Sequence, residues 1–237
     1  MNQSHQPHRL ALIVPVYNET PDAVSNLRKI ACLADIDEMI ISDASDSLRR
    51  TEALDTLRRD HSDKVRVLHS DMPQRAAQMN LASANTTADI LWFVHADTTP
   101  PSNAARLIRH AIGTGNRWGR FDVEFDNPAG IMKVVAMMMN RRSALSGICT
   151  GDQAMFIEHN MFRANGGFPA IPLMEDVSLS KRLKRAQRPA RIRTPVLTSA
   201  RRWEKNGYVR TIALMWTLRL LHSLGVSATT LQRMYGN

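Results

Sequence analysis

The feature that most constrains this chain is an alternation of short apolar runs with segments of helical periodicity in its first half. The apolar runs lie at 10–16, 39–41, 65–68 and 90–94. The helical segments lie at 21–31, 48–60, 74–84 and, after a cap at Ser102 or Asn103, up to 112. Near-continuous apolar strands that alternate with helices predict an α/β fold, with a mostly parallel sheet flanked by helices.

The second half of the chain is less regular. Strands are predicted at 121–125, 154–157 and 191–197, and helices at 129–146, 175–186 and 207–224. The sequence contains no internal repeat and no Gly- or Pro-rich linker. We therefore expect one domain over residues 1–205, followed by a helical C-terminal tail over 206–237.

Polar side chains follow three of the predicted strands directly. Asn18-Glu19 comes after the first strand, Asp43 ends the second, and His95 and Asp97 follow the fourth. Open α/β sheets bind ligands beyond the carboxyl ends of their strands. Asp97 with His95 suits Mg²⁺ or Mn²⁺, while the alternative role for Asp97 is a local hydrogen bond in the turn before Pro100.

Two further clusters allow a chemical and a structural interpretation. Glu175-Asp176 opens a predicted helix, where acids are favoured by the helix dipole, and one carboxylate there could also act as a general base. Arg201-Arg202-Trp203 could clamp a diphosphate and stack a ring. The structural alternative is a basic surface loop with Trp203 packed in the core.

The net charge of +9 is concentrated in one part of the chain. Residues 181–210 hold eleven Lys or Arg and one acid, so the rest is nearly neutral. A phosphorylated ligand, a nucleic acid or an anionic membrane could be the partner of such a block, while the structural alternative, which a charge run alone favours, is a solvated helix face and a basic loop. Two widely separated cysteines form no disulfide framework, which favours a reducing, cytoplasmic location. A spanning helix and a signal peptide are not expected.

The predicted helix at 207–224 is apolar around much of its circumference and follows the basic block. A cationic, apolar helix of this kind can lie at an anionic membrane surface, here the inner face of the membrane. An apolar helix is also commonly buried, so the sequence leaves open packing on the sheet or on a second copy in a homodimer.

Taken in order, the motifs resemble those of family-2 glycosyltransferases of the GT-A fold, whose sheet is Rossmann-like. The matching segments are 14–19 (VPVYNE), 42–46 (SDASD), 75–80 (RAAQMN), 95–97 (HAD), 151–153 (GDQ), 166–168 (GGF), 175–179 (EDVSL) and 201–203 (RRW). The pattern is closest to the subgroup associated with arsenosugar biosynthesis. His95 replaces the first Asp of the family's D-x-D motif, and Ser199 replaces the Gln of Q-x-x-R-W.

The resemblance implies inverting transfer of a sugar from a nucleoside diphosphate sugar to an acceptor hydroxyl. The implied donor-binding residues are Pro15, Glu19, Asp43, Arg75, Asp97 and Arg202. Asp97, with His95, would hold Mg²⁺ or Mn²⁺, and Asp176, supported by Glu175, would act as general base. Asp152 and Trp203 would contact the acceptor, which the sequence does not identify.

Two other functions fit parts of the sequence. A nucleotidyltransferase of related fold would carry a Gly-rich, Arg-containing loop after the first strand, where this chain has Asn18-Glu19-Thr20. A non-enzymatic polyanion-binding protein would use the basic block. Few aromatic residues lie among its arginines and no nucleic-acid-binding motif occurs, so nucleic acid is not an expected partner.

Overall fold

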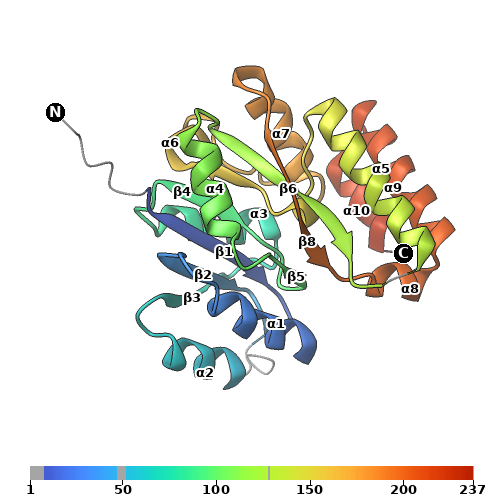
Figure 1. Cartoon of the computed structure of the whole chain (residues 1–237). Coiled ribbons are helices and arrows are strands. Elements are labelled where there is room, and N and C mark those ends of the chain that lie inside the picture. Colours follow the sequence, from blue (N-terminus) through green and yellow to red (C-terminus); the bar gives the residue numbers. More distant parts are fainter. Residues whose placement is uncertain (1–7, 47–51, 128, 237) are drawn as a thin grey trace.

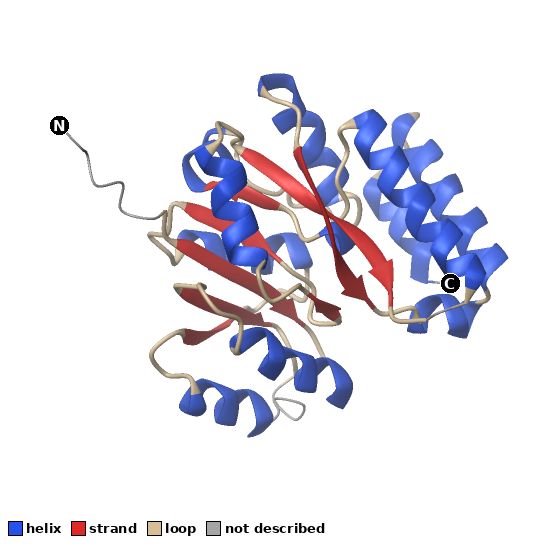
Figure 2. Ribbon diagram, viewed as in Figure 1, coloured by secondary structure: helices blue, strands red, loops and turns tan. Residues whose placement is uncertain are grey.

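The chain folds into a curled, mixed β-sheet flanked by helices, which confirms the predicted α/β class (Figures 1 and 2). The computed structural model describes residues 8–46, 52–127 and 129–236. The strands are β1 Leu10–Val16, β2 Glu38–Asp43, β3 Val65–His69, β4 Ile90–Phe93, β5 Thr98–Thr99, β6 Trp118–Phe125, β7 Phe156–Glu158 and β8 Ala190–Thr198. Across these described strands the sheet order is β3-β2-β1-β4-β7-β6-β8-β5.

The first half is built as the sequence predicts. β1 pairs in parallel with β2 and β4, and β2 with β3. The helices are α1 Pro21–Ala31, α2 Glu52–Asp60, α3 Arg75–Ala84 and α4 Ala104–Gly113. Thr20 caps α1, where its Oγ1 accepts from the Ala23 amide at 3.5 Å, and Pro21 takes the first helical position. The predicted start of α2 at residue 48 lies outside the described residues.

The far half of the sheet is mixed rather than parallel. β7 runs antiparallel to β4 and β6, β5 runs antiparallel to β8, and β6 and β8 are parallel. The remaining helices before the tail are α5 Gly130–Ser146, α6 His159–Ala164 and α7 Glu175–Ala186, with a short 3₁₀ turn, η1, at Gly151–Gln153. β5, η1 and α6 were not predicted, because elements of two to six residues are too short to show a hydrophobic period.

Both faces of the central strands are buried, and this accounts for their continuous apolar runs. One face of β1, with Leu10, Leu12 and Val14, packs against α1, α2 and α4. The opposite face, with Ala11 and Ile13, packs against α3, α6 and α7. Successive strand residues point to opposite faces of the sheet. When helices cover both faces, every residue of the strand is buried, so apolar and polar residues do not alternate.

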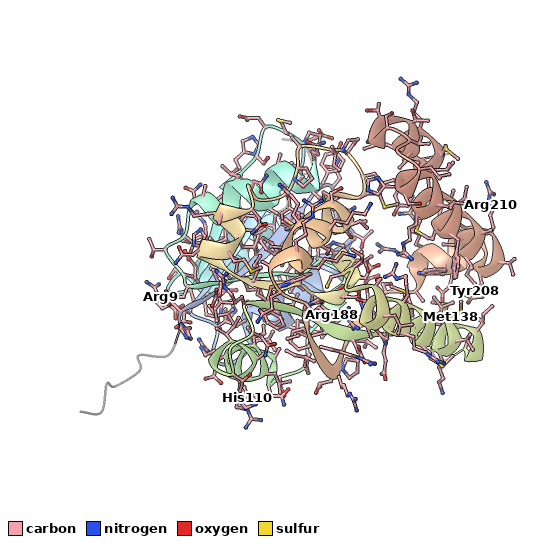
Figure 3. The ribbon with its side chains drawn as sticks, turned by 90° about the horizontal axis from the view of Figure 1, so that it is seen from above. Arg9, His110, Met138, Arg188, Tyr208 and Arg210 are labelled. Atoms are coloured by element: carbon pink, nitrogen blue, oxygen red, sulfur yellow. The ribbon has the colours of Figure 1, made fainter. Side chains whose placement is uncertain are left out.

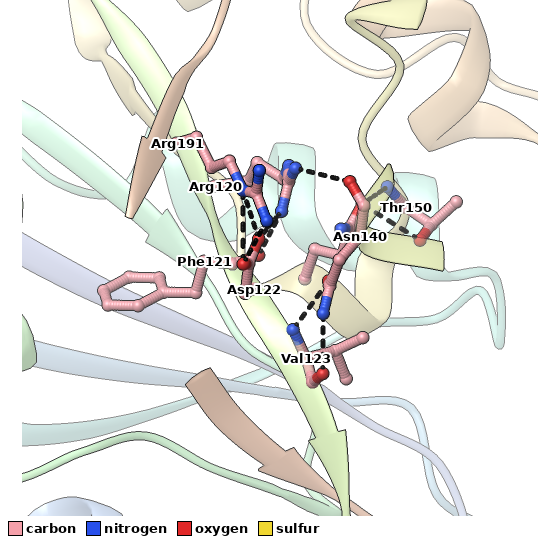
Figure 4. A network of polar contacts seen from close by, with 8 residues as sticks. Arg120, Phe121, Asp122, Val123, Asn140, Thr150 and Arg191 are labelled. Carbon is pink, nitrogen blue, oxygen red and sulfur yellow. Dashed lines mark hydrogen bonds and ion pairs between the residues drawn. The ribbon is translucent and has the colours of Figure 1, made fainter. Parts of the chain in front are cut away.

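Helix α5 is fixed to the sheet by a buried charged network (Figure 4). Arg120, only 1% exposed, and Arg191 both pair with Asp122, the latter at 2.7 Å. Arg120 also donates to the Asn140 carbonyl on α5 at 3.1 Å, and the Asn140 amide pairs with the backbone of Val123. These bonds fix the position of α5 relative to β6 and β8.

The C-terminal segment forms a helical layer with α5 beside the sheet (Figure 1). Its helices are α8 Arg201–Asn206, α9 Tyr208–Ser223 and α10 Ala228–Gly236. Leu218 of α9 and Leu231 of α10 pack with Leu173, Met174 and Val177 around the start of α7. α9 is therefore buried along one side only. Among the described helices none is both long and apolar enough to cross a membrane.

Candidate active site

The carboxyl ends of β1 and β2 are tied together by one buried amide. Gln78 on α3 is 1% exposed, and its Nε2 donates to the Val16 carbonyl at 2.6 Å and to the Ser42 carbonyl at 2.7 Å. Pro15 is buried within β1, so its surroundings are sheet and core. Asp43 ends β2, and its Oδ1 accepts from the Ser45 amide at 2.8 Å. Gln78 thus fixes the strand ends that present Glu19 and Asp43.

Two carboxylates lie close together just beyond these strand ends. Burial and the negative charge of Asp97 raise the pKa of Glu19, which shows that the two groups share one electrostatic environment. A second buried amide holds the Asp97 segment, because Asn26 Nδ2 donates to the Ala96 and Thr98 carbonyls at 2.9 and 3.0 Å. A carboxylate on a segment held in this way suits a divalent cation that prefers oxygen ligands.

Asp97 also borders an open, polar cleft of about 610 Å³ between α1, β8 and α8. Arg201 lines the same cleft and donates to Thr20 Oγ1 at 2.8 Å. Its positive charge opposes the rise in the Glu19 pKa. Of the two neighbouring arginines, Arg201 therefore lies by the carboxylates.

His95 faces Asp152 across 3.4 Å, from Nδ1 to Oδ1. Burial opposes charge on both groups, but their contact raises the pKa of His95 and lowers that of Asp152. Gly151 makes room for the ring, because a Cβ there would lie 2.4 Å from two imidazole atoms. The contact with Asp152 favours the protonated imidazole, which offers no lone pair to a metal, so metal binding by His95 stays a prediction.

Glu175 and Asp176 begin α7 and have different partners. Glu175 is 3% exposed and its Oε1 pairs with Arg75 Nη2 at 3.1 Å. Burial raises the pKa of Glu175, and the Arg75 charge opposes that rise. Asp176 is half-buried, and its two oxygens accept from the Gly151 and Val177 amides at 2.8 and 2.6 Å. Arg75, Glu175 and Asp176, predicted separately along the sequence, are thus brought together.

Arg202 is held by the C-terminal helix. Its guanidinium carbon lies 3.6 Å from the centroid of the Tyr235 ring, and Nη1 hydrogen-bonds the Tyr235 hydroxyl. The interpretation of Arg201-Arg202-Trp203 as a loop was wrong, because these residues form the first turn of α8.

Trp203 agrees with both interpretations that the sequence left open, packing in the core and lining a binding site. Its ring packs edge-to-face on Phe125, with 5.7 Å between the centroids, and it contacts the core. It also lines, together with Asp152, a small cavity between α5 and α9. The two predicted acceptor contacts therefore meet at one place.

Sequence reasoning missed several residues that shape this region. Asn26 and Gln78 act through single hydrogen-bonded amides, and only Gln78 lies in a motif that the sequence singled out. Tyr235 comes near the end of a tail with no motif. Arg142 and Arg219 line the cavity beside Asp152, and they lie on the predicted helices at 129–146 and 207–224 but in none of the matched motifs.

Among comparisons with known proteins, the sequence model of the family described as glycosyl transferase family 2 matches residues 11–165. No curated protein matches significantly. The fold is similar to that of the mannosyltransferase PcManGT from Pyrobaculum calidifontis in complex with GDP-Man and Mn²⁺, with a TM-score of 0.64 and 18% identity over 82% of this chain and 57% of that one. It is also similar to S. aureus TarS 1-349 in complex with UDP-GlcNAc, with a TM-score of 0.63 and 12% identity over 81% of this chain and 58% of that one.

The chain therefore spans somewhat more than half the length of these proteins. The structural likeness supports the GT-A fold, and the family model covers the segment that carries β1 to α6, including Glu19, Asp97 and Asp152. The family resemblance drawn from the motifs is confirmed, and the chain belongs to glycosyl transferase family 2.

Proposed function

We propose that this protein transfers a sugar from a nucleoside diphosphate sugar to an acceptor hydroxyl with inversion, using Asp176 as general base. The observation that carries this proposal is the position of Asp176, whose carboxylate is held by two backbone amides between Arg75-Glu175 and His95-Asp152. The family match favours sugar transfer over the nucleotidyl transfer and polyanion binding that the sequence left open. The two similar structures bind GDP-Man and UDP-GlcNAc.

The donor would bind at the carboxyl ends of β1, β2 and β4. Glu19, Asp43 and Arg75 would line the nucleotide site, Pro15 would support it from within β1, and Arg202 would contact the diphosphate. Mg²⁺ or Mn²⁺ would be held by Asp97, a carboxylate beyond the end of β4 whose negative charge also acts on Glu19. Among the described residues no three His, Cys, Asp or Glu side chains gather as a cage, so the diphosphate would supply further ligands. When bound, the ion would neutralise charge on the leaving diphosphate.

Asp176 would accept the proton of the acceptor hydroxyl. The hydroxyl oxygen forms a bond to the anomeric carbon while the bond from that carbon to the diphosphate oxygen breaks, and the nucleoside diphosphate leaves with the electron pair. Fixed positive charge near the departing oxygen stabilises it without reorganisation. Glu175 would orient Arg75 beside Asp176, and Asp152 and Trp203 would contact the acceptor.

Finer features of the proposal rest on the sequence pattern. The motif order places the chain nearest the subgroup associated with arsenosugar biosynthesis. The boundary between residues 1–205 and 206–237 falls at the end of α8, so α9 and α10 form the proposed tail. A cytoplasmic protein that contacts the inner membrane face, or that forms a homodimer through the tail, agrees with the apolar exposed side of α9.

The test is Asp176→Asn, which keeps the shape of the side chain and removes its basicity. We expect the rate of transfer to fall by about 10²–10⁴-fold. Transfer is followed as nucleoside diphosphate release from a panel of UDP- and GDP-sugars, with Mn²⁺ present and cell extract as the source of acceptor. Donor binding, measured by thermal shift, should not change. The matched control is Asp89→Asn, since Asp89 also accepts a backbone amide but at the opposite end of β4. Transfer within a few-fold of the parent would exclude Asp176 as the base.

A further inference from the structure

Two arginines lie between α5 and α9 without an acidic partner. Arg142 comes from α5 and Arg219 from α9, and both line the cavity that also contains Asp152. The Nε and Nη2 atoms of Arg142 are buried and make no hydrogen bond. Throughout the described part of the chain, no ion pair joins either guanidinium to a carboxylate. Burial and the neighbouring charge of Arg219 lower the pKa of Arg142 to about 10, and burial also lowers the pKa of Arg219.

The nearby carboxylates form no ion pair with these two arginines. Asp176 and Asp152 act on Arg219, and Asp176 on Arg142, through space. Asp176 is engaged with backbone amides and Asp152 with His95. Two buried guanidinium nitrogen atoms without a hydrogen-bond acceptor are costly, and two arginines that line one cavity match a phosphate or carboxylate. The arrangement is therefore complementary to an anion supplied from outside the chain.

Exposed apolar side chains continue from the wall of this cavity onto the outer surface. The cavity, of about 70 Å³, is also lined by Met138, Trp203, Met215 and Trp216. Trp216 is 61% exposed and Met138 41% exposed, so each belongs both to the cavity wall and to the outer surface. Leu220 and Leu224 continue the stripe along α9 and are largely exposed. Figure 3 shows α9, with Arg210, and α5, with Met138, at the same end of the molecule.

The position next to Asp152 and Asp176 links this cavity to the reaction. A ligand whose anionic group lies between Arg142 and Arg219 would have the rest of its polar head at these two carboxylates. Its apolar part would lie over Trp216 and Met138. An ordinary soluble sugar would leave both the arginines and the apolar stripe unsatisfied.

We propose that the cavity between α5 and α9 binds the anionic head group of an amphiphilic acceptor, a phosphate or carboxylate joined to an apolar chain. This inference rests on the sugar transfer proposed above and names the substrate class of its acceptor side. Arg142 and Arg219 bind the anion, and Trp216 with Met138 contacts the apolar part.

The test uses monododecyl phosphate below its micelle concentration as the probe, followed by calorimetric titration of the full chain. We expect it to bind at least about tenfold more tightly than inorganic phosphate or dodecyl maltoside. Inorganic phosphate lacks the apolar chain, and dodecyl maltoside lacks the anionic group. The double variant R142M/R219M should lose at least about tenfold in affinity. The matched control R141M/R210M removes two exposed charges from the same helices and should bind as the parent does.

A loss in the control as large as that in R142M/R219M would overturn the proposal, because binding would then reflect surface charge alone. Failure of every probe to bind would overturn it too, as would a dimer in sedimentation that buries the stripe and excludes the probe. R142M/R219M should retain the parent melting temperature or exceed it, because it removes unpaired buried charges.

A second arm identifies the source of the amphiphile. Full-length protein is floated with phosphatidylcholine vesicles that contain one fifth phosphatidylglycerol or none. Flotation that needs the anionic lipid and is lost in R142M/R219M assigns a membrane lipid, while binding of monomeric dodecyl phosphate alone assigns a free amphiphile. Thermal shift with nucleotide sugars is run in parallel. Dodecyl phosphate binding without any donor binding would refute the proposed transfer and leave the anion site standing.

Discussion

Two sides of this site are held in place by different interactions. On the strand-end side, the neutral buried amides of Gln78 and Asn26 bond to backbone carbonyls at the ends of β1, β2 and the Asp97 segment. On the helical side, formed by α5, the starts of α3 and α7 and the C-terminal helices, charged and aromatic side chains hold the structure, as in Arg75-Glu175 and Arg202-Tyr235. Arg142 there has no partner at all for two of its nitrogen atoms.

The difference has a physical consequence for each side. An amide bonded to backbone carbonyls fixes the strand ends at any pH and salt concentration, which suits recognition of a constant nucleotide. Ion pairs and cation–π contacts depend on pH, salt and bound ligand, and side chains without partners can accept a new one. The strand-end side is thus preorganised, and the helical side is completed by what binds to it.

The largest effect should come from Arg75→Met, which removes the partner of the buried Glu175. We expect the free energy of unfolding to fall by about 3 kcal/mol near neutral pH, because an unpaired buried carboxylate remains. Burial raises the folded-state pKa of Glu175, and the Arg75 charge that opposes this rise is lost. A group with a raised folded pKa contributes stability below its ordinary pKa and loses it as pH rises. The loss in free energy of unfolding relative to the parent should therefore shrink as the pH falls toward about 4.5. Urea titrations at several pH values measure this loss.

The double variant R75M/E175Q is the control for this pH dependence. It removes the titrating group as well as its partner, so the deficit should become nearly independent of pH. A deficit in Arg75→Met that is flat between about pH 5 and 8 would mean that charge does not hold this side together.

Gln78→Leu should cost less, about 2 kcal/mol, and the loss should not change with pH. The substitution keeps a similar volume and leaves the Ser42 carbonyl without the amide donor, while Val16 still accepts from the Ala44 amide at 3.0 Å. Gln74→Leu is the matched control, because Gln74 precedes the same helix and its side chain makes no capping bond. A pH-dependent loss would break the contrast between the two sides.

The sequence predicted the first half of the fold well because each element there carries its own signal. β1 is apolar over its whole length, and Thr20-Pro21 marks the start of α1. The pairing of β7 between β4 and β6 and the placing of α10 over Arg202 depend on contacts far apart in the chain. No local period encodes such contacts, so sequence reasoning did not find them.

The same limit applies to the site. Residues in ordered motifs, such as Asp97, Asp152 and Asp176, could be proposed from the sequence because a motif gives each a place along the chain. The ion pairs Arg75-Glu175 and His95-Asp152 join residues from different motifs and became visible only in three dimensions. The unpaired state of Arg142 is a property of its surroundings, and a sequence records only that an arginine is present.

Asn26→Ala tests whether a neutral amide positions the proposed metal ligand. Loss of its two bonds to the Ala96 and Thr98 carbonyls frees the segment that carries Asp97. We expect the Mn²⁺ concentration for half-maximal transfer to rise about tenfold, with a smaller change in the rate at saturating Mn²⁺. Ser25→Ala, exposed on the same helix, should match the parent. An unchanged Mn²⁺ dependence would show that the Asp97 segment needs no amide to hold it.

The smallest effect should come from Tyr235, whose ring stacks on the Arg202 guanidinium on the helical side. Tyr235→Phe keeps the ring under Arg202 and removes the hydroxyl, so transfer should stay within about twofold of the parent. Tyr235→Ala removes a cation–π contact worth about 1 kcal/mol, and a more mobile Arg202 should lower the rate by about fivefold. Both rates are measured at saturating donor. Equal losses in the two variants would assign the effect to the hydroxyl, and faster transfer in Tyr235→Ala would mean that α10 withholds Arg202 from the diphosphate.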